Sequence, residues 1–157
     1  TNDPSDAIAP KQMEMTLDVM ANSLVYWTQA LILSGLMGRG GRIYAMTSSG
    51  GHRIWPSYGA VSAAKAALES HIRQLAFELA PNGITANSIQ AGVTDTAALR
   101  KIPGNIQMIE KAREVNPHHE STTPEAVADA IASFATGGTQ WMTGNVIRVD
   151  GGEDITG

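Results

Sequence analysis

The 157-residue sequence contains no cysteine, which excludes disulfides, thiol catalysis and thiolate metal sites. It has no excess of basic residues, because 11 Lys and Arg stand against 15 Asp and Glu, so nucleic-acid binding is not expected. Apolar runs stop well short of the roughly 20 residues that cross a membrane, and residues 1–10 lack the features of a signal peptide. His118 and His119 have no third ligand at a metal-binding spacing, so no metal is expected. These absences favour a cytoplasmic protein that binds neither nucleic acid nor membrane.

What the sequence does contain is an ordinary globular composition, with 43% hydrophobic and 17% charged residues. The length is that of roughly one domain. Residues 1–15 begin with a polar, proline-bounded stretch and are expected to form an arm or a break point. Residues 16–157 are expected to form a single domain.

Hydrophobic periodicity predicts helices and strands that alternate along the chain. Short apolar segments at residues 42–47, 84–89 and 145–149 predict buried strands. Helices are predicted from a cap at Thr16 to the glycines at 35–41, over residues 57–80, in parts of 95–115, and from a cap at Thr123 to Gly137. Strands separated by helices need crossover connections, so an α/β fold with a parallel sheet is expected.

The clearest chemical signal follows the first predicted strand. Ser48 comes at its carboxyl end, where ligands bind in open α/β sheets. Tyr58 and Lys65 come ten and seventeen positions later, and seven helical positions return to nearly the same face. An ammonium stabilises a phenolate, and a Tyr hydroxyl can donate a proton to a developing oxyanion. The pattern alone is more often that of a packed Tyr and a solvated Lys than of a site, and the Asp150 and Glu153 charges are interpreted as turn and tail residues.

The same stretch resembles the short-chain dehydrogenase/reductase superfamily. The resemblance starts with Thr47-Ser48-Ser49-Gly50, Tyr58 and Ser62-Ala63-Ala64-Lys65. Later segments agree with the superfamily in the same order: residues 79–89, residues 91–96, and residues 142–152 with their Val149-Asp150-Gly151-Gly152 ending. It implies the C-terminal part of a Rossmann-like, doubly wound parallel sheet, namely its strands five to seven with their helices.

The Tyr–Lys spacing narrows the resemblance to one subfamily. Carbonyl-reducing members place Tyr four positions before Lys, but Val61 occupies that position here and cannot donate a proton. Tyr58, six residues and Lys65 resemble the divergent enoyl-acyl-carrier-protein reductases. Residues 94–103 resemble the NADPH-using branch of that subfamily.

The resemblance implies that NADPH or NADH reduces a trans-2-enoyl thioester of acyl carrier protein or CoA in fatty acid synthesis. Tyr58 would hydrogen-bond the enolate oxygen, Lys65 would bind the nicotinamide ribose, and Ser48, which stands where one branch has a second Tyr, would complete the catalytic set. Residues implied to contact the cofactor are Lys65, Gly92, Val93, Thr94 and Thr96. Residues implied to flank the acyl chain, for which ordinary loop packing is an equal alternative, are His52, Trp55, Leu99, Ile102 and Met108.

The resemblance also predicts a missing segment. The glycine-rich turn that holds the dinucleotide phosphates in this family has no counterpart here, since the glycines at 35–41 precede a strand. An N-terminal half is therefore expected elsewhere, the chain alone is not expected to be active, and a homodimer or homotetramer is expected. The alternatives are a carbonyl or alcohol oxidoreductase of the same superfamily and a non-catalytic oligomerising pseudoenzyme.

Overall fold

The structure of the chain is a computed structural model that describes residues 7–156. Residues 1–6 of the predicted arm lie outside the described residues. The elements, in chain order, are α1 (Pro10–Leu17), the π-helix η2 (Asp18–Asn22), α2 (Ser23–Leu33), β1 (Arg42–Ser48), η3 (Ser49–Gly51), α3 (Gly59–Leu79), η4 (Ala80–Asn82), β2 (Thr85–Ala91), η5 (Leu99–Lys101), α4 (Asn105–Val115), α5 (Pro124–Thr136), β3 (Val146–Val149) and α6 (Glu153–Thr156).

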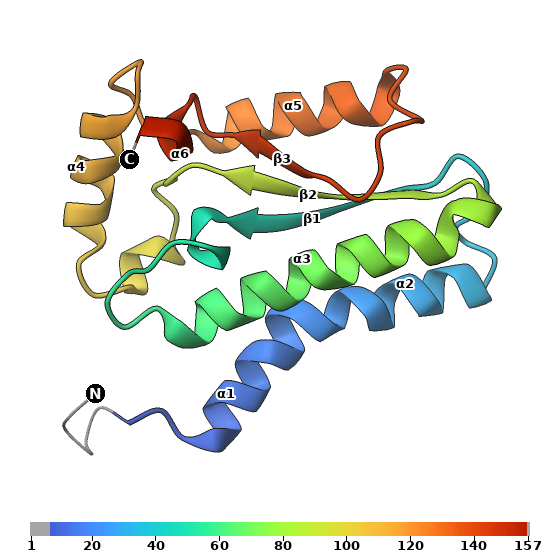
Figure 1. Ribbon diagram of the computed structural model, residues 1–157, viewed down its shortest axis with the longest axis horizontal. Helices are drawn as coiled ribbons and strands as arrows, with labels where there is room; N and C mark the ends of the chain where they lie inside the picture. The colour runs from blue at the N-terminus through green and yellow to red at the C-terminus, as the bar shows by residue number, and fades with distance from the viewer. Residues whose placement is uncertain (1–6, 157) are drawn as a thin grey trace.

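The strands form one parallel sheet in the order β1-β2-β3, which confirms the predicted α/β fold. The helices α3 and α5 flank the strands from opposite sides, and α2 runs alongside α3 (Figure 1). The register pairs Ser48 with Ala91 and Ala91 with Val149, so the three strands end at the same edge of the sheet. This shared edge brings the loops that follow the strands together.

The apolar core lies between α3 and the strands. Along α3 the buried side chains recur every three or four residues, as one helical face requires: they are Ala64, Leu68, Ile72, Leu75 and Ala76. Ile72, Ile84 and Ile89 are the largest apolar side chains that are fully buried. On β1 the buried residues alternate with more exposed ones, and Met46 is 42% exposed, so one face of the sheet is less covered at β1 than the other.

One predicted helix start is wrong, one differs by two residues, and one is confirmed. The first helix begins at Pro10, and Thr16 lies inside it, where its hydroxyl donates to the Gln12 carbonyl oxygen at 2.8 Å. The helix predicted from residue 57 begins at Gly59, because Ser57 has a φ of 61°, which an α-helix does not allow. Thr123 caps α5 as predicted, since its Oγ1 accepts a hydrogen bond from the Ala126 amide at 3.2 Å.

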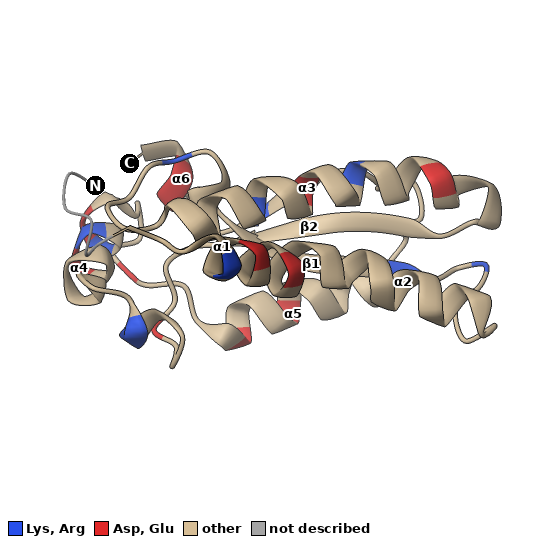
Figure 2. Cartoon of the chain, turned by 90° about the horizontal axis from the view of Figure 1, so that it is seen from below, with Lys and Arg blue, Asp and Glu red and all other residues tan. Residues whose placement is uncertain are grey.

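Charged residues are spread over the helices and loops, with acidic and basic positions interspersed (Figure 2). The exposed ion pairs join near neighbours in the sequence, such as Arg100 with Asp95 and Lys111 with Glu114. Within residues 7–156, no helix combines the length and apolar character needed to cross a membrane.

Candidate active site

Ser48 and Tyr58 lie next to each other at the carboxyl end of β1. The chain turns through η3 and returns, so that the Tyr58 ring covers Gly50, where any side chain larger than hydrogen would overlap the ring. A Cβ on Gly50 would also lie 3.3 Å from the Ser48 Oγ, which places this hydroxyl beside the ring. The Ser62 hydroxyl donates to the Gly50 carbonyl oxygen at 2.5 Å and ties this turn to α3. Glycine at position 50 is therefore required for Tyr58 to approach the strand end.

The sequence had suggested that Tyr58 lies within the body of the helix. In the structure it is the N-cap residue of α3. Its backbone has φ −102° and ψ 1°, and its carbonyl oxygen accepts the first helical hydrogen bond from the Ser62 amide. The preceding Ser57 adopts a left-handed φ, a conformation that costs free energy in a non-glycine residue and clusters at functional sites. The helix start and the turn at Ser57 together fix the direction in which Tyr58 enters the site.

Lys65 extends from α3 towards β1. Its Nζ donates a hydrogen bond to the Met46 carbonyl oxygen at 2.7 Å. Burial lowers the pKa of Lys65, and the nearby Glu69 carboxylate partly opposes this shift. Glu69 itself accepts a hydrogen bond from the Thr47 hydroxyl at 2.6 Å. The ammonium group is thus placed against the carboxyl end of β1, at a residue two positions before Ser48.

The loop after β2 carries the residues implied to contact the cofactor. The Gly92 amide continues the sheet by donating to the Val149 carbonyl oxygen at 3.3 Å. The Thr94 hydroxyl donates to the Gly92 carbonyl oxygen, and the Thr96 Oγ1 accepts from the Leu99 amide at the start of η5. A Cβ at Gly92 would lie 2.7 Å from a Glu153 carboxylate oxygen and would overlap the Thr122 hydroxyl, so this position needs glycine.

The structure places the five implied acyl-contact residues on the segments that follow β1 and β2. Leu99 is buried in η5, and Ile102, Met108 and Trp55 are partly buried. His52 follows η3, and its Nε2 lies 3.2 Å from the Asp154 carboxylate. Their contact with an acyl chain stays a prediction.

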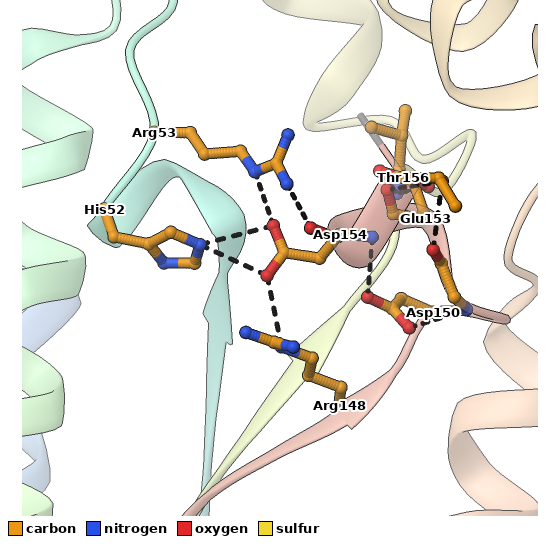
Figure 3. Close-up of polar contacts among 9 residues, drawn as sticks. His52, Arg53, Arg148, Asp150, Glu153, Asp154 and Thr156 are labelled. Carbon is orange, nitrogen blue, oxygen red and sulfur yellow. Dashed lines mark hydrogen bonds and ion pairs between the residues drawn. The ribbon is translucent and has the colours of Figure 1, made fainter. Parts of the chain in front are cut away.

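The sequence interpretation of Asp150 as a turn residue is confirmed, since its carboxylate accepts the Gly152 amide at 3.0 Å, but the interpretation of Glu153 as a tail charge is wrong. Asp150, Glu153 and Asp154 are only 6–8% exposed. Glu153 accepts a hydrogen bond from the Val93 amide, and Asp154 is ion-paired with His52, Arg53 and Arg148 (Figure 3). One sequence signal could have indicated their burial: three acids follow directly after a strand end. Buried acids require partners, and basic residues that could serve as partners occur earlier in the sequence. In the described residues, no group of three or more His, Asp and Glu side chains is arranged to hold a metal ion.

The residues at this edge fit the nicotinamide end of a dinucleotide. Among the described residues, the buried Ser48 Oγ has no hydrogen-bond partner, so it is available to a polar ligand group. Lys65 and Thr94 add a donor ammonium and a hydroxyl at the same sheet edge. Residues 7–156 contain no glycine-rich strand-to-helix turn for the phosphates, so the fit is to one end of the cofactor.

The chain has a parallel sheet with helices on both sides, and Ser48, Tyr58 and Lys65 lie near the carboxyl end of β1. This combination is typical of a Rossmann-like reductase. The profile of a family described as enoyl-(acyl carrier protein) reductase matches residues 2–153. The chain therefore belongs to the enoyl-(acyl carrier protein) reductase family.

Individual relatives agree with the family profile. The chain is 34% identical over 144 residues to the enoyl-(acyl-carrier-protein) reductase (NADH) FabI of Aquifex aeolicus, covering 92% of this chain and 53% of that protein. It is 38% identical over 122 residues to FabI of Synechocystis, covering 78% and 47%. The crystal structure of the Aquifex aeolicus enzyme superimposes with a TM-score of 0.89 at 33% identity, over 96% of this chain and 58% of that one. The chain thus spans about half the length of the curated relatives it matches.

Proposed function

We propose that the protein carrying this chain reduces trans-2-enoyl thioesters of acyl carrier protein or CoA in fatty acid synthesis, with NADPH or NADH as reductant. The observation that carries the proposal is Tyr58, which packs over Gly50 beside the Ser48 hydroxyl and precedes Lys65 by seven positions. Val61 occupies the place of the carbonyl-reducing Tyr and cannot donate a proton. Membership of the family and the NADH reductases among its relatives support the same chemistry.

The residues of this chain have separable tasks in that reaction. The nicotinamide, when bound, supplies the hydride that reaches the β carbon of the thioester. The Tyr58 hydroxyl would donate a hydrogen bond to the thioester oxygen, on which negative charge develops. Lys65 would exchange its bond to the Met46 oxygen for one to the nicotinamide ribose, and the free Ser48 hydroxyl would complete the polar wall. Gly92, Val93, Thr94 and Thr96 would line the nicotinamide amide and phosphates from the loop after β2.

The phosphates and adenosine need a segment beyond these residues. The chain spans about half of its relatives, and it has no phosphate-binding glycine turn. We infer that an N-terminal half, in the same or another polypeptide, pairs with the exposed edge of β1 and completes the sheet. Mass spectrometry of the protein from its native source tests this inference: an intact mass well above the 16.6 kDa of this chain, or a co-purifying partner chain, supports it. A lone chain of 16.6 kDa with full activity contradicts it.

Exposed apolar side chains on the helices favour association of several copies. Trp27, Leu33 and Phe77 are 70%, 87% and 79% exposed on α2 and α3. We infer a homodimer or homotetramer, which light scattering of the purified protein will test. The absence of cysteine fits a reducing compartment, and we place the protein in the cytoplasm.

A pair of substrates tests the reaction. Crotonyl and acetoacetyl thioesters are offered to the complete protein with NADPH and, separately, with NADH, and cofactor oxidation is followed at the nicotinamide absorbance. We expect turnover of the crotonyl thioester. Turnover of the acetoacetyl thioester alone would assign the protein to the carbonyl reductases instead, and turnover of neither would favour a non-catalytic role.

Tyr58 is tested by removing one oxygen. Tyr58→Phe keeps the ring over Gly50 but removes the hydroxyl, so kcat is expected to fall by about 10²- to 10⁴-fold. The matched control is Tyr26→Phe, because the Tyr26 hydroxyl bonds Asp18 on the exposed surface of α2. Equal activity of the two variants would remove Tyr58 from the mechanism.

A further inference from the structure

The short helix α6 lies where the loops after β1 and β2 meet the end of β3. Its first two residues, Glu153 and Asp154, are each 8% exposed although both carry carboxylates. A buried carboxylate is costly unless partners satisfy it, so the partners of these two groups show what holds them there. The two side chains have different partners, in two different loops.

Glu153 reaches the loop after β2. Its two carboxylate oxygens lie 3.0 and 3.3 Å from the Val93 amide nitrogen, which donates to them. Gly92 packs so closely against this carboxylate that a Cβ there would lie 2.7 Å from it. The hydrogen bond therefore fixes the peptide that joins Gly92 to Val93, the first peptide of the loop with the implied cofactor contacts.

Asp154 reaches the loop after β1. Its carboxylate lies 3.2 Å from the His52 Nε2 and 2.5 Å from the Arg53 Nε, and its carbonyl oxygen accepts a further bond from the Arg53 guanidinium. From β3, the Arg148 Nε lies 3.1 Å from the same carboxylate. Figure 3 shows the carboxylate between the two residues of the loop and Arg148. Asp154 thus fastens the segment between Ser48 and Tyr58 to the end of the sheet.

The anchor itself is held in place by the turn before it. The Asp150 carboxylate accepts hydrogen bonds from the Gly152 and Asp154 amides at 3.0 and 3.2 Å. The Asn116 side-chain amide donates to the Asp150 carbonyl oxygen at 2.9 Å. Hydrogen bonds from the turn before α6 and from Asn116 thus hold the start of this helix against the loops it contacts.

We propose that Glu153 and Asp154 are positioning residues with separate targets: Glu153 orients the nicotinamide-binding loop through the Val93 amide, and Asp154 orients the loop between Ser48 and Tyr58 through His52 and Arg53. The proposal rests on the proposed function. Displacements of about 1 Å in a site can cost about 10²-fold in rate, so two anchors with different targets predict two different kinetic defects.

The test compares isosteric and non-isosteric variants of the complete protein. Glu153→Leu removes the acceptor of the Val93 amide and is expected to raise KM for NAD(P)H about tenfold or more, with KM for crotonyl thioester within about twofold. Glu153→Gln keeps an acceptor oxygen and is expected to restore most of the cofactor affinity. Asp154→Asn is expected to give the converse split, with lower kcat or a higher thioester KM and little change in cofactor KM. Glu120→Gln, an exposed acid, is the matched control.

A measurement independent of turnover separates this proposal from the proposed function. In ¹H–¹⁵N spectra, the Val93 amide signal is expected to shift in Glu153→Leu and to stay near its place in Asp154→Asn. If the unaltered protein turns over no thioester, the proposed function fails, and this spectrum still tests the anchor. If the unaltered protein is active but both variants change the two KM values equally, or the Val93 signal does not move in Glu153→Leu, the positioning roles are overturned.

Discussion

The apolar core beneath α3 and the polar cluster at the carboxyl ends of the strands are both buried, but they are stabilised differently. In the core, Ile72 and Ile84 are 0% and 2% exposed and are held by packing, which depends on size and shape. In the cluster, Asp154 and Glu153 are almost as inaccessible, but each depends on named donors at defined distances. The core therefore determines that the chain folds, while the cluster determines where the loops of the site lie.

The largest effect on stability is expected in the core. Ile72→Ala leaves a cavity that the close-packed strands cannot fill, so the free energy of unfolding should fall by about 2–5 kcal/mol. Urea denaturation of the complete protein measures this change. The matched control is Ile54→Ala, because Ile54 is 98% exposed, and its effect should stay within about 0.5 kcal/mol. Equal effects of the two variants would contradict the position assigned to the core.

The next effect is expected at Asp154 and should depend on pH. Burial acts to raise the pKa of Asp154, but hydrogen bonds from Gln90, His52 and Arg53, together with the charge of His52, outweigh it and hold this pKa below its ordinary value. A lowered folded pKa gives stability that is present above the unfolded pKa and is lost as pH falls through the folded one. Asp154→Asn should thus lower the free energy of unfolding by about 1–3 kcal/mol at neutral pH, since a charge-assisted bond is lost.

Acid titration of this variant provides the check. The three partners, His52 and the two arginines, are 37–49% exposed and can return to water, which keeps the loss below that of a fully buried broken pair. The deficit of Asp154→Asn should shrink as pH falls below about 4. A deficit of constant size across the acid range would show that the charge of Asp154 contributes nothing.

A smaller effect is expected at the cap of α5. Thr123→Ala removes the Oγ1 acceptor of the Ala126 amide and should cost about 1 kcal/mol. Thr123→Ser keeps the acceptor and should recover most of this loss. Urea denaturation of the two variants measures both changes, and equal losses in Thr123→Ala and Thr123→Ser would contradict the capping role of the Thr123 hydroxyl.

The smallest effect, with the opposite sign, is expected at Glu153. Burial raises the pKa of Glu153, and the Val93 amide only partly opposes this. A raised folded pKa means that the protein loses stability as pH rises from the unfolded pKa through the folded one. Glu153→Gln lacks this loss, so its stability relative to the unaltered protein should increase with pH over that range. Thermal unfolding measured between about pH 4 and 7 tests the sign, and a decrease would contradict it.

Much of the fold followed from local patterns. The sequence predicted the three strands and the cap at Thr123, because apolar periodicity and capping chemistry are local properties. The parallel direction of the strands followed from the helices that separate them. The first helix begins at Pro10, whereas the sequence predicted that Thr16 would cap it. Pro is a favourable first helical residue, so the sequence contained two possible helix starts. The left-handed Ser57, which delays α3 to Gly59, has no pattern in the sequence that would indicate it.

The sequence by itself determined the α/β class and the family resemblance, and it predicted the Ser48, Tyr58 and Lys65 set, because these depend on residue type and spacing. Only the tertiary structure decided that Glu153 and Asp154 are buried against the loops of the site. Their partners in those loops, Val93 and His52, lie about 60 and 100 positions earlier in the chain, and only the parallel register, which brings the three strand ends to one edge, places them in contact. Contacts between such distant residues are set by topology, which no local sequence pattern encodes.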